Sequence, residues 1–258
     1  ITTDSRAYNL LGRPFADNII SGAVATATRT STACAINTAS KIWMSGIKPV
    51  YRLTTKSGYK LTATADHKIL TTAGKMEIGK LTKEHEILIQ PGEGLWSTND
   101  KLPFEVINLI SGKNGRLYHF NLPDRWSIEL GQILGWLIGD GWVRDKAKEN
   151  MVGFTFAQND KSVLEYLKPV INRWYGTSIK EIERENGVYH LNYSSKFFVG
   201  YMKALGVKAV DAGHKEVPHT IFKAPKSAVV GFLQGLFGAD GTIANDIKKG
   251  NRYVRLTS

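Results

Sequence analysis

The chain has 258 residues, 42% of them hydrophobic, which suits two folded domains and excludes a disordered polypeptide. Lys and Arg outnumber Asp and Glu by 34 to 23, and the net charge of +11 favours a polyanionic partner. The single cysteine excludes an internal disulfide framework, and no apolar run is long enough to span a bilayer, so we expect a cytoplasmic protein without a membrane partner.

The first half of the chain is rich in strand-forming residues. Between residues 48 and 90, runs of Val, Tyr, Thr and Ile are broken at Gly58 and Gly74, which is typical of β-hairpins. Within this stretch Thr64-Ala65-Asp66-His67 resembles the Thr-x-x-His element of inteins, the self-splicing protein segments. That resemblance implies that Thr64 and His67 polarise the peptide bond cleaved in the first N-to-S acyl shift. The alternative is a merely hydrogen-bonded histidine of a β-domain.

An intein also needs a nucleophilic first residue. The single cysteine, Cys34, stands only thirty residues before Thr64, closer than inteins normally place this element, and residues 2–15 resemble the segment that follows the nucleophile. We therefore expect the first residue of the intein to lie just upstream of Ile1. The alternative is that Cys34 begins the intein and residues 1–33 belong to the host protein.

A short segment occurs twice in the second half of the chain. Residues 131–143 read GQILGWLIGDGWV and residues 231–243 read GFLQGLFGADGTI, each an apolar run of helix length that ends in Asp-Gly. Small residues recur every four positions on one face of each predicted helix. They are Gly131, Gly135 and Gly139 in the first copy, and Gly231, Gly235 and Ala239 in the second.

Glycine in a helix interior costs about 1 kcal/mol relative to alanine, so these glycines indicate a close approach of two helix backbones. Helices that pack along these faces bring Asp140 and Asp240 side by side at their ends. Adjacent carboxylates repel unless a cation lies between them, and Mg²⁺ (or Mn²⁺) prefers such oxygen ligands. The alternative for either copy alone is a core helix that ends in a glycine cap.

Both copies resemble the signature motifs of the LAGLIDADG homing endonucleases, and the resemblance covers about residues 124–258. It implies one αββαββα half for each motif, with the signature helices at the interface between halves. It also implies that Asp140 and Asp240 bind catalytic divalent metal ions. The partner of such an enzyme is a long double-stranded DNA site, read by antiparallel strands in the major groove.

The same resemblance indicates further site residues. Gln158 matches a polar residue at the end of a strand near the active site, and Lys215-Glu216-Val217-Pro218 resembles a Lys-x-x-Pro element whose lysine polarises water or phosphate. Ordinary strand-end or loop residues are the alternatives. Lys196 is a second candidate for the active-site lysine and could equally contact the DNA backbone. The candidate contacts to the DNA backbone are basic residues near the strands and after the second motif: Lys196, Lys248, Lys249, Arg252 and Arg255.

The sequence thus predicts an α+β protein with two domains. Residues 1–123 would form a β-rich, Hint-like splicing domain, and residues 124–258 a LAGLIDADG endonuclease whose second half is incomplete. Inteins finish in a His-Asn dipeptide, which this chain lacks, and Ile1 is not an initiator residue, so we expect truncation at both ends.

The predicted function is a site-specific, metal-dependent DNA endonuclease within an intein, flanked by a host protein such as a ribonucleotide reductase or replication protein. The alternatives are a splicing element with a decayed endonuclease, and a nucleic-acid-binding or RNA maturase module on the same fold.

Overall fold

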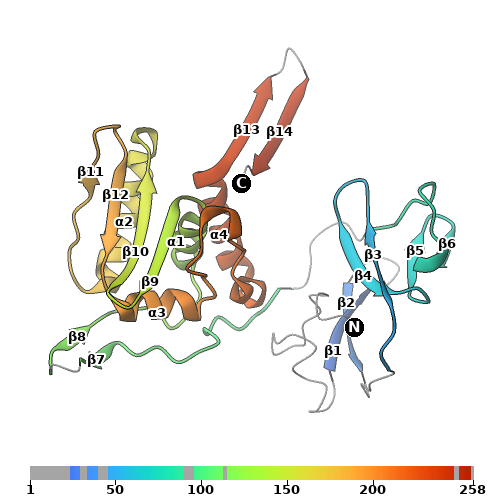
Figure 1. Cartoon of the computed structure of the whole chain (residues 1–258), viewed down its shortest axis with the longest axis horizontal. Coiled ribbons are helices and arrows are strands. Elements are labelled where there is room, and N and C mark those ends of the chain that lie inside the picture. The colour runs from blue at the N-terminus through green and yellow to red at the C-terminus, as the bar shows by residue number, and fades with distance from the viewer. Residues whose placement is uncertain are drawn as a thin grey trace. The chain divides into compact units, whose positions relative to one another are not determined.

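A computed structural model of the chain describes residues 24–29, 34–39, 46–89, 96–112, 115–246 and 250–256. The chain divides into two compact units, Ile1–Leu95 and Trp96–Ser258 (Figure 1). Residues 2–15, Lys248 and Lys249 lie outside the described residues, and Cys34 is the first residue of a strand. Within the described part of the chain, no helix combines the length and apolar character needed to cross a membrane.

The described part of the first unit is built from two-stranded antiparallel hairpins, and it contains no helix longer than one turn. Its strands are β1 (Val24–Arg29), β2 (Cys34–Ala39), β3 (Val50–Thr54), β4 (Lys60–Thr64), β5 (Lys68–Thr71) and β6 (Gly74–Glu77), paired in sequence order, followed by the 3-10 helix η2 (Ile78–Lys80). Gly58 and Gly74 take φ values of +87° and +103°, which L-residues rarely adopt. The two hairpin breaks predicted from the sequence are therefore found where these glycines stand.

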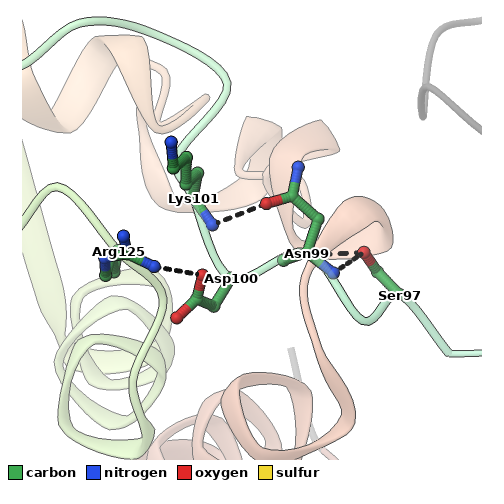
Figure 2. A network of polar contacts seen from close by, with 5 residues as sticks. All are labelled: Ser97, Asn99, Asp100, Lys101 and Arg125. Atoms are coloured by element: carbon green, nitrogen blue, oxygen red, sulfur yellow. Dashed lines mark hydrogen bonds and ion pairs between the residues drawn. The ribbon is translucent and has the colours of Figure 1, made fainter.

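Residues 96–123, here called the entry segment, lead into the helices of the second unit, and local hydrogen bonds connect this segment to the residues just before α1. Figure 2 shows Asp100 paired with Arg125, beside a turn in which Asn99 accepts a hydrogen bond from the backbone N–H of Lys101. Nη1 of Arg125 lies 2.7 Å from Oδ1 of Asp100. The backbone adds bonds from Trp126 N to Asp100 O and from Leu102 N to Asp124 O. The exposed ion pair itself contributes little, so the backbone bonds and the burial of the neighbouring side chains hold this segment.

The division between the units falls at Leu95–Trp96, earlier than the boundary at 123/124 expected from the motifs. The entry segment contains the short hairpin β7 (Leu109–Ser111) and β8 (Leu117–His119). Its side chains Leu102, Phe120 and Leu122 are buried in the hydrophobic core of the second unit. Residues 96–123 therefore pack with the helical unit, although no motif in their sequence indicates this.

The second unit follows an αββαββα order and then begins the order again. Its elements are α1 (Ile128–Asp140), β9 (Gly141–Lys146), β10 (Glu149–Phe156), α2 (Lys161–Tyr175), β11 (Ile182–Glu183), β12 (Tyr189–Tyr193) and α3 (Lys196–Ala204), then α4 (Lys226–Asp240), β13 (Gly241–Asp246) and β14 (Asn251–Leu256). Short 3-10 helices connect them: η3 (Gln158–Asp160), η4 (Ala212–His214) and η5 (His219–Lys223). The first four strands form one antiparallel sheet in the order β11-β12-β10-β9.

One face of this sheet forms the core with the helices. Alternate residues on β10 and β12, such as Phe154, Phe156 and Leu191, are fully buried, because successive strand residues point to opposite faces. In Figure 1, α2 lies behind these strands. On the opposite face, Trp142 and Asn192 are only partly buried.

The two copies of the repeat differ in what covers them. Ile133 of α1 is 0% exposed and Val143 of β9 is 8% exposed, whereas their counterparts Leu233 and Ile243 are 46% and 79% exposed. In the first copy the sheet has four strands, while in the second the described residues form the two-stranded hairpin β13–β14. The first copy is therefore packed on both its helix and its sheet, and the second is packed mainly through α4.

Candidate active site at the ends of two paired helices

Helices α1 and α4 pack backbone against backbone through the glycines of the repeat. A Cβ placed on Gly135 would lie 2.1 Å from the carbonyl oxygen of Phe232, and one placed on Gly235 would lie 2.1 Å from that of Gln132. Gly131 and Gly231 face carbonyl oxygens of the opposite helix at 2.1 and 2.3 Å in the same way. Real Cβ atoms do not approach backbone so closely, so glycine permits this contact. The packing runs the length of both helices and brings their C-terminal ends together.

At that end the contact continues through Gly139 and Ala239. A Cβ on Gly139 would lie 2.5 Å from the Cβ of Ala239 and 3.3 Å from Oδ2 of Asp240. The carboxylate of Asp240, the last residue of α4, therefore lies against the last turn of α1, which ends at Asp140. The structure thus brings Asp140 and Asp240 to one place.

The pKa of Asp140 shows the electrostatic consequence of this placement. Burial raises it above the ordinary value for an aspartate, and the negative charges of Asp240 and Asp160 raise it further, while Lys215 lowers it. A carboxylate whose charged form is disfavoured by burial and like charges is a carboxylate that gains from a neighbouring cation.

Lys215 supplies a positive charge at this position. It follows η4, and its Nζ donates hydrogen bonds to the carbonyl oxygens of Gly139 at 2.8 Å and of Gly141 at 2.7 Å, on either side of Asp140. Burial lowers the pKa of Lys215, and the charges of Asp240 and Asp140 oppose that shift. The ammonium group therefore occupies the negative end of the α1 dipole, beside both carboxylates.

Gln158 and Asp160 stand together in η3 but face different surroundings. Gln158 is exposed, and its Oε1 lies 3.4 Å from a Cβ placed on Gly187, in the turn between β11 and β12. Asp160 was not singled out by the sequence, yet its charge acts on Asp140. Its Oδ2 accepts a hydrogen bond from the backbone of Ala157 at 3.2 Å. The sequence signal that could have found it is an acidic residue just before the helix that begins at Lys161.

The basic residues predicted to contact DNA do not form one cluster among the described residues. Lys196 begins α3, with its Nζ 4.8 Å from the centroid of the Phe197 ring. Arg252 and Arg255 are exposed on β14, opposite Asn245 and Thr242. Because they are three positions apart in a strand, their side chains leave opposite faces of the hairpin.

Thr64 and His67 lie in one tight turn of the first unit. The backbone N–H of His67 donates to the carbonyl oxygen of Thr64 at 3.1 Å, and the carbonyl oxygen of His67 accepts from Ile78 at 2.9 Å. A hydrogen bond from the Thr64 side chain, followed by the charge of Lys48, holds the pKa of Asp66 below its usual range. The structure therefore brings the two predicted splicing residues together, with His67 exposed.

The oxygen-rich donor set at the helix ends is small. Among the residues that the structure describes, no group of three or more His, Cys, Asp and Glu side chains could hold a metal ion. Carboxylates from Asp140 and Asp240 and the backbone carbonyls bonded by Lys215 are the oxygen donors at this place. Oxygen donors of this kind suit Mg²⁺ or Mn²⁺ rather than a soft metal.

Replacing Asp140 with Asn is expected to stabilise the protein at neutral pH. The raised pKa means that the folded state binds the proton on Asp140 more tightly than the unfolded state does. The protonated carboxyl therefore contributes its full stability below about pH 4, and this contribution is lost as pH rises through the folded pKa. Thermal melts at several pH values should show a higher melting temperature for Asp140→Asn at pH 7 and little difference at pH 3. The exposed control Asp211→Asn should show no such pH-dependent gain. A lower melting temperature for Asp140→Asn at pH 7 would contradict the expectation.

Comparisons with known proteins give partial matches. No family model matches the chain. Over 189 residues it is 31% identical to a DNA polymerase of Thermococcus hydrothermalis. This match covers 71% of this chain and 10% of the polymerase. Over 233 residues it is 28% identical to the tRNA-splicing ligase RtcB of Methanopyrus kandleri, covering 79% of this chain and 22% of the ligase. The chain thus spans about a tenth and about a fifth of the length of these relatives.

Similar solved structures are homing endonucleases. Variants of the homing endonuclease I-DmoI match with a TM-score of 0.31 and 18% identity, over 45% of this chain and 59% of theirs. The homing endonuclease I-WcaI, bound to its DNA recognition sequence, matches with a TM-score of 0.31 and 15% identity, over 46% of this chain and 53% of its own.

Proposed function

We propose that the chain belongs to a protein-splicing element that carries a site-specific, metal-dependent DNA endonuclease of the LAGLIDADG type. The observation that carries this proposal is the meeting of Asp140 and Asp240 at the ends of two glycine-packed helices, with the Lys215 ammonium beside them. Two acidic residues, one from each copy of the repeat, suit a reaction on a duplex with two equivalent strands, and Lys215 adds one positive charge beside them.

The sequence relatives support the splicing part of the proposal. They have the names of two different enzymes, a DNA polymerase and a tRNA-splicing ligase, and the similarity touches only a small part of each. A segment shared by otherwise different enzymes is what an insert common to both would produce. The polymerase match supports a replication protein as the host, and the ribonucleotide reductase named above remains a second prediction.

The residues at the helix ends fit a divalent metal ion. The donors are hard oxygen atoms. The pKa of Asp140 is raised first by burial and then by the negative charges of Asp240 and Asp160, and a bound cation would offset these effects. Asp140 and Asp240 would hold Mg²⁺ or Mn²⁺. When bound there, the ion supplies an activated water molecule and stabilises charge on a phosphate group.

The side chains around the two carboxylates have roles of their own. Lys215 is fixed by two carbonyl oxygens, so its positive charge is already in place near the expected position of a phosphate. A fixed charge costs no reorganisation when the reaction occurs. Net positive charge over the whole chain favours the approach of DNA, and the sheet face away from the helices is available for contact with a groove.

A pool of randomised double-stranded DNA tests the endonuclease. With Mg²⁺ present, the chain should select a subset of sequences and cut both strands, and with EDTA it should bind but not cut. Binding should weaken steeply with salt, because each phosphate contact releases counterions. Selective, salt-sensitive binding without cleavage under any divalent ion would support the decayed-endonuclease or RNA-maturase alternative, and salt-independent binding would remove DNA as the partner.

The splicing part makes a separate prediction. In the precursor with host sequence on both sides, His67→Ala should slow N-terminal peptide cleavage and splicing but leave DNA cutting, because Thr64 and His67 lie in the other unit from the aspartates. Asp240→Asn should do the reverse. His85→Ala removes another histidine of the same unit, whose ring bonds Thr82, and serves as the control. Normal splicing by His67→Ala would show that Thr64-Ala65-Asp66-His67 is a chance match.

A further inference from the structure

Three neighbouring strands place one row of residues across the sheet face that is turned away from the helices. Trp142 of β9 is paired with Gly153 of β10, and Gly153 is paired with Asn192 of β12. Residues paired across antiparallel strands share a face. Trp142 and Asn192 therefore stand on the same side of the sheet, with Gly153 between them.

The indole ring of Trp142 lies on Gly153. A Cβ on Gly153 would come within 2.1 Å of Cε2 and 2.2 Å of Cζ2 of the ring, so no other residue could stand there without moving it. The ring also meets the imidazole of His190 edge-on, with the centroids 5.2 Å apart. The indole is thus spread over the middle of the row toward β12.

Two polar atoms in this row are buried without a hydrogen-bond partner in the described part of the chain. They are Nε1 of Trp142, a donor, and Oδ1 of Asn192, an acceptor. They stand on either side of Gly153 and do not bond to each other. A buried polar group without a partner is unfavourable, so this arrangement is one that a ligand offering both an acceptor and a donor would improve.

We propose that Trp142 is a movable cover over Asn192, and that duplex DNA displaces the indole so that Asn192 reads an adenine base. The proposal rests on the proposed function, because it assumes that this sheet face meets a major groove. The amide of asparagine matches adenine: Oδ1 accepts from the N6 amino group and Nδ2 donates to N7. When the indole is displaced, both unpartnered atoms gain a partner on the DNA. Oδ1 of Asn192 accepts from the adenine, and Nε1 of Trp142 can donate to a base or phosphate oxygen.

The neighbouring groups fit a nucleic-acid ligand. The Nε of Arg184 donates to Nδ1 of His190 at 3.3 Å, which places a guanidinium group at the edge of the row and leaves Nε2–H of the imidazole as a donor. Arg144, two residues after Trp142 on β9, is paired with Glu149. Arg184 therefore brings positive charge to the β12 edge of the row, whereas the charge of Arg144 is compensated by Glu149. Phosphate groups flank any base pair that the row could read.

Base selection measures the role of Asn192. The full chain and its Asn192→Ala variant are each mixed with the randomised duplex pool, and the bound sequences are compared. We expect one position at which the parent prefers adenine and the variant does not, with discrimination falling about 5- to 150-fold, the range of one good bidentate contact. Asn186→Ala, in the exposed turn between β11 and β12, removes the same side chain outside the row and should keep the preference.

Opening the row measures the role of Trp142. Gly153→Ala should push the indole aside, shift tryptophan emission to longer wavelength, and tighten binding to the selected duplex while the adenine preference is kept. If Gly153→Ala does not fold, Trp142→Ala takes its place, because it removes the indole without adding a clash. This variant should also bind the selected duplex more tightly and keep the adenine preference.

The outcomes separate this inference from the proposed function. If the parent selects and cuts DNA but Asn192→Ala has an unchanged base profile, the reading role is wrong. If both opened variants bind the selected duplex more weakly than the parent, Trp142 is a contact rather than a cover. If the parent selects no duplex, the proposed function itself is wrong.

Discussion

Asp140→Asn and Asp240→Asn are each expected to abolish DNA cleavage while leaving DNA binding almost unchanged. Asparagine keeps the size and shape of the side chain but removes the negative charge that the paired helix ends bring to one place. Loss of a group that stabilises charge in a reaction costs on the order of a hundred- to a thousandfold in rate, and loss of a metal ligand should cost at least as much.

Cleavage and binding of the selected duplex, measured separately, check this result. Asp211→Asn is the matched control, because Asp211 is an exposed aspartate of the same unit and lies before η4 rather than at the helix ends. Normal cleavage by either Asp140→Asn or Asp240→Asn would show that these residues do not form the catalytic pair. The pairing of lost cleavage with gained stability in Asp140→Asn would show further that the folded protein bears an electrostatic cost at this site.

Gly135→Ala is expected to destabilise the second unit strongly, even though alanine favours helices. The new methyl group would lie 2.1 Å from the carbonyl oxygen of Phe232 and 2.7 Å from the backbone nitrogen of Leu236, neither of which can move without separating the helices. Overpacking costs typically 1–3 kcal/mol and occasionally more, and a clash with backbone belongs at the upper end. A loss of about 3 kcal/mol lowers the melting temperature by roughly 10 °C in a domain of this size.

Gly200→Ala is the control of opposite sign. Gly200 lies in α3 with nothing within 4 Å of a Cβ, so alanine there should gain about 1 kcal/mol of helix stability. Thermal unfolding of both variants decides the matter. Equal melting temperatures for Gly135→Ala and the parent would mean that α1 and α4 do not pack backbone to backbone.

The position of a glycine along the contact between α1 and α4 decides what alanine would cost there. Ala239 meets Gly139 at the open end of the contact, where side chains meet side chains, whereas Gly135 faces backbone near the middle. Gly135→Ala and Gly135→Leu should therefore both separate the helices, and Gly135→Leu should do so more.

Features with a local physical cause could be predicted from the sequence alone. The segment that forms α2 is one of them, because its apolar residues recur at helical spacing. The hairpins break at Gly58 and Gly74 because the turns need positive φ. Spacing also sufficed for the glycine face and for the two aspartates, since a repeat implies that its copies occupy equivalent places.

Tertiary structure alone decided the features that join distant residues. The entry segment packs with the second unit, Lys215 bonds the carbonyl groups beside Asp140, and Asp160 acts on the same carboxylate. The row of Trp142, Gly153 and Asn192 exists only because strand register aligns three strands. Periodicity and turn residues report on the few residues around each position, whereas these contacts depend on how strands pair and helices pack, which no local pattern in the chain contains.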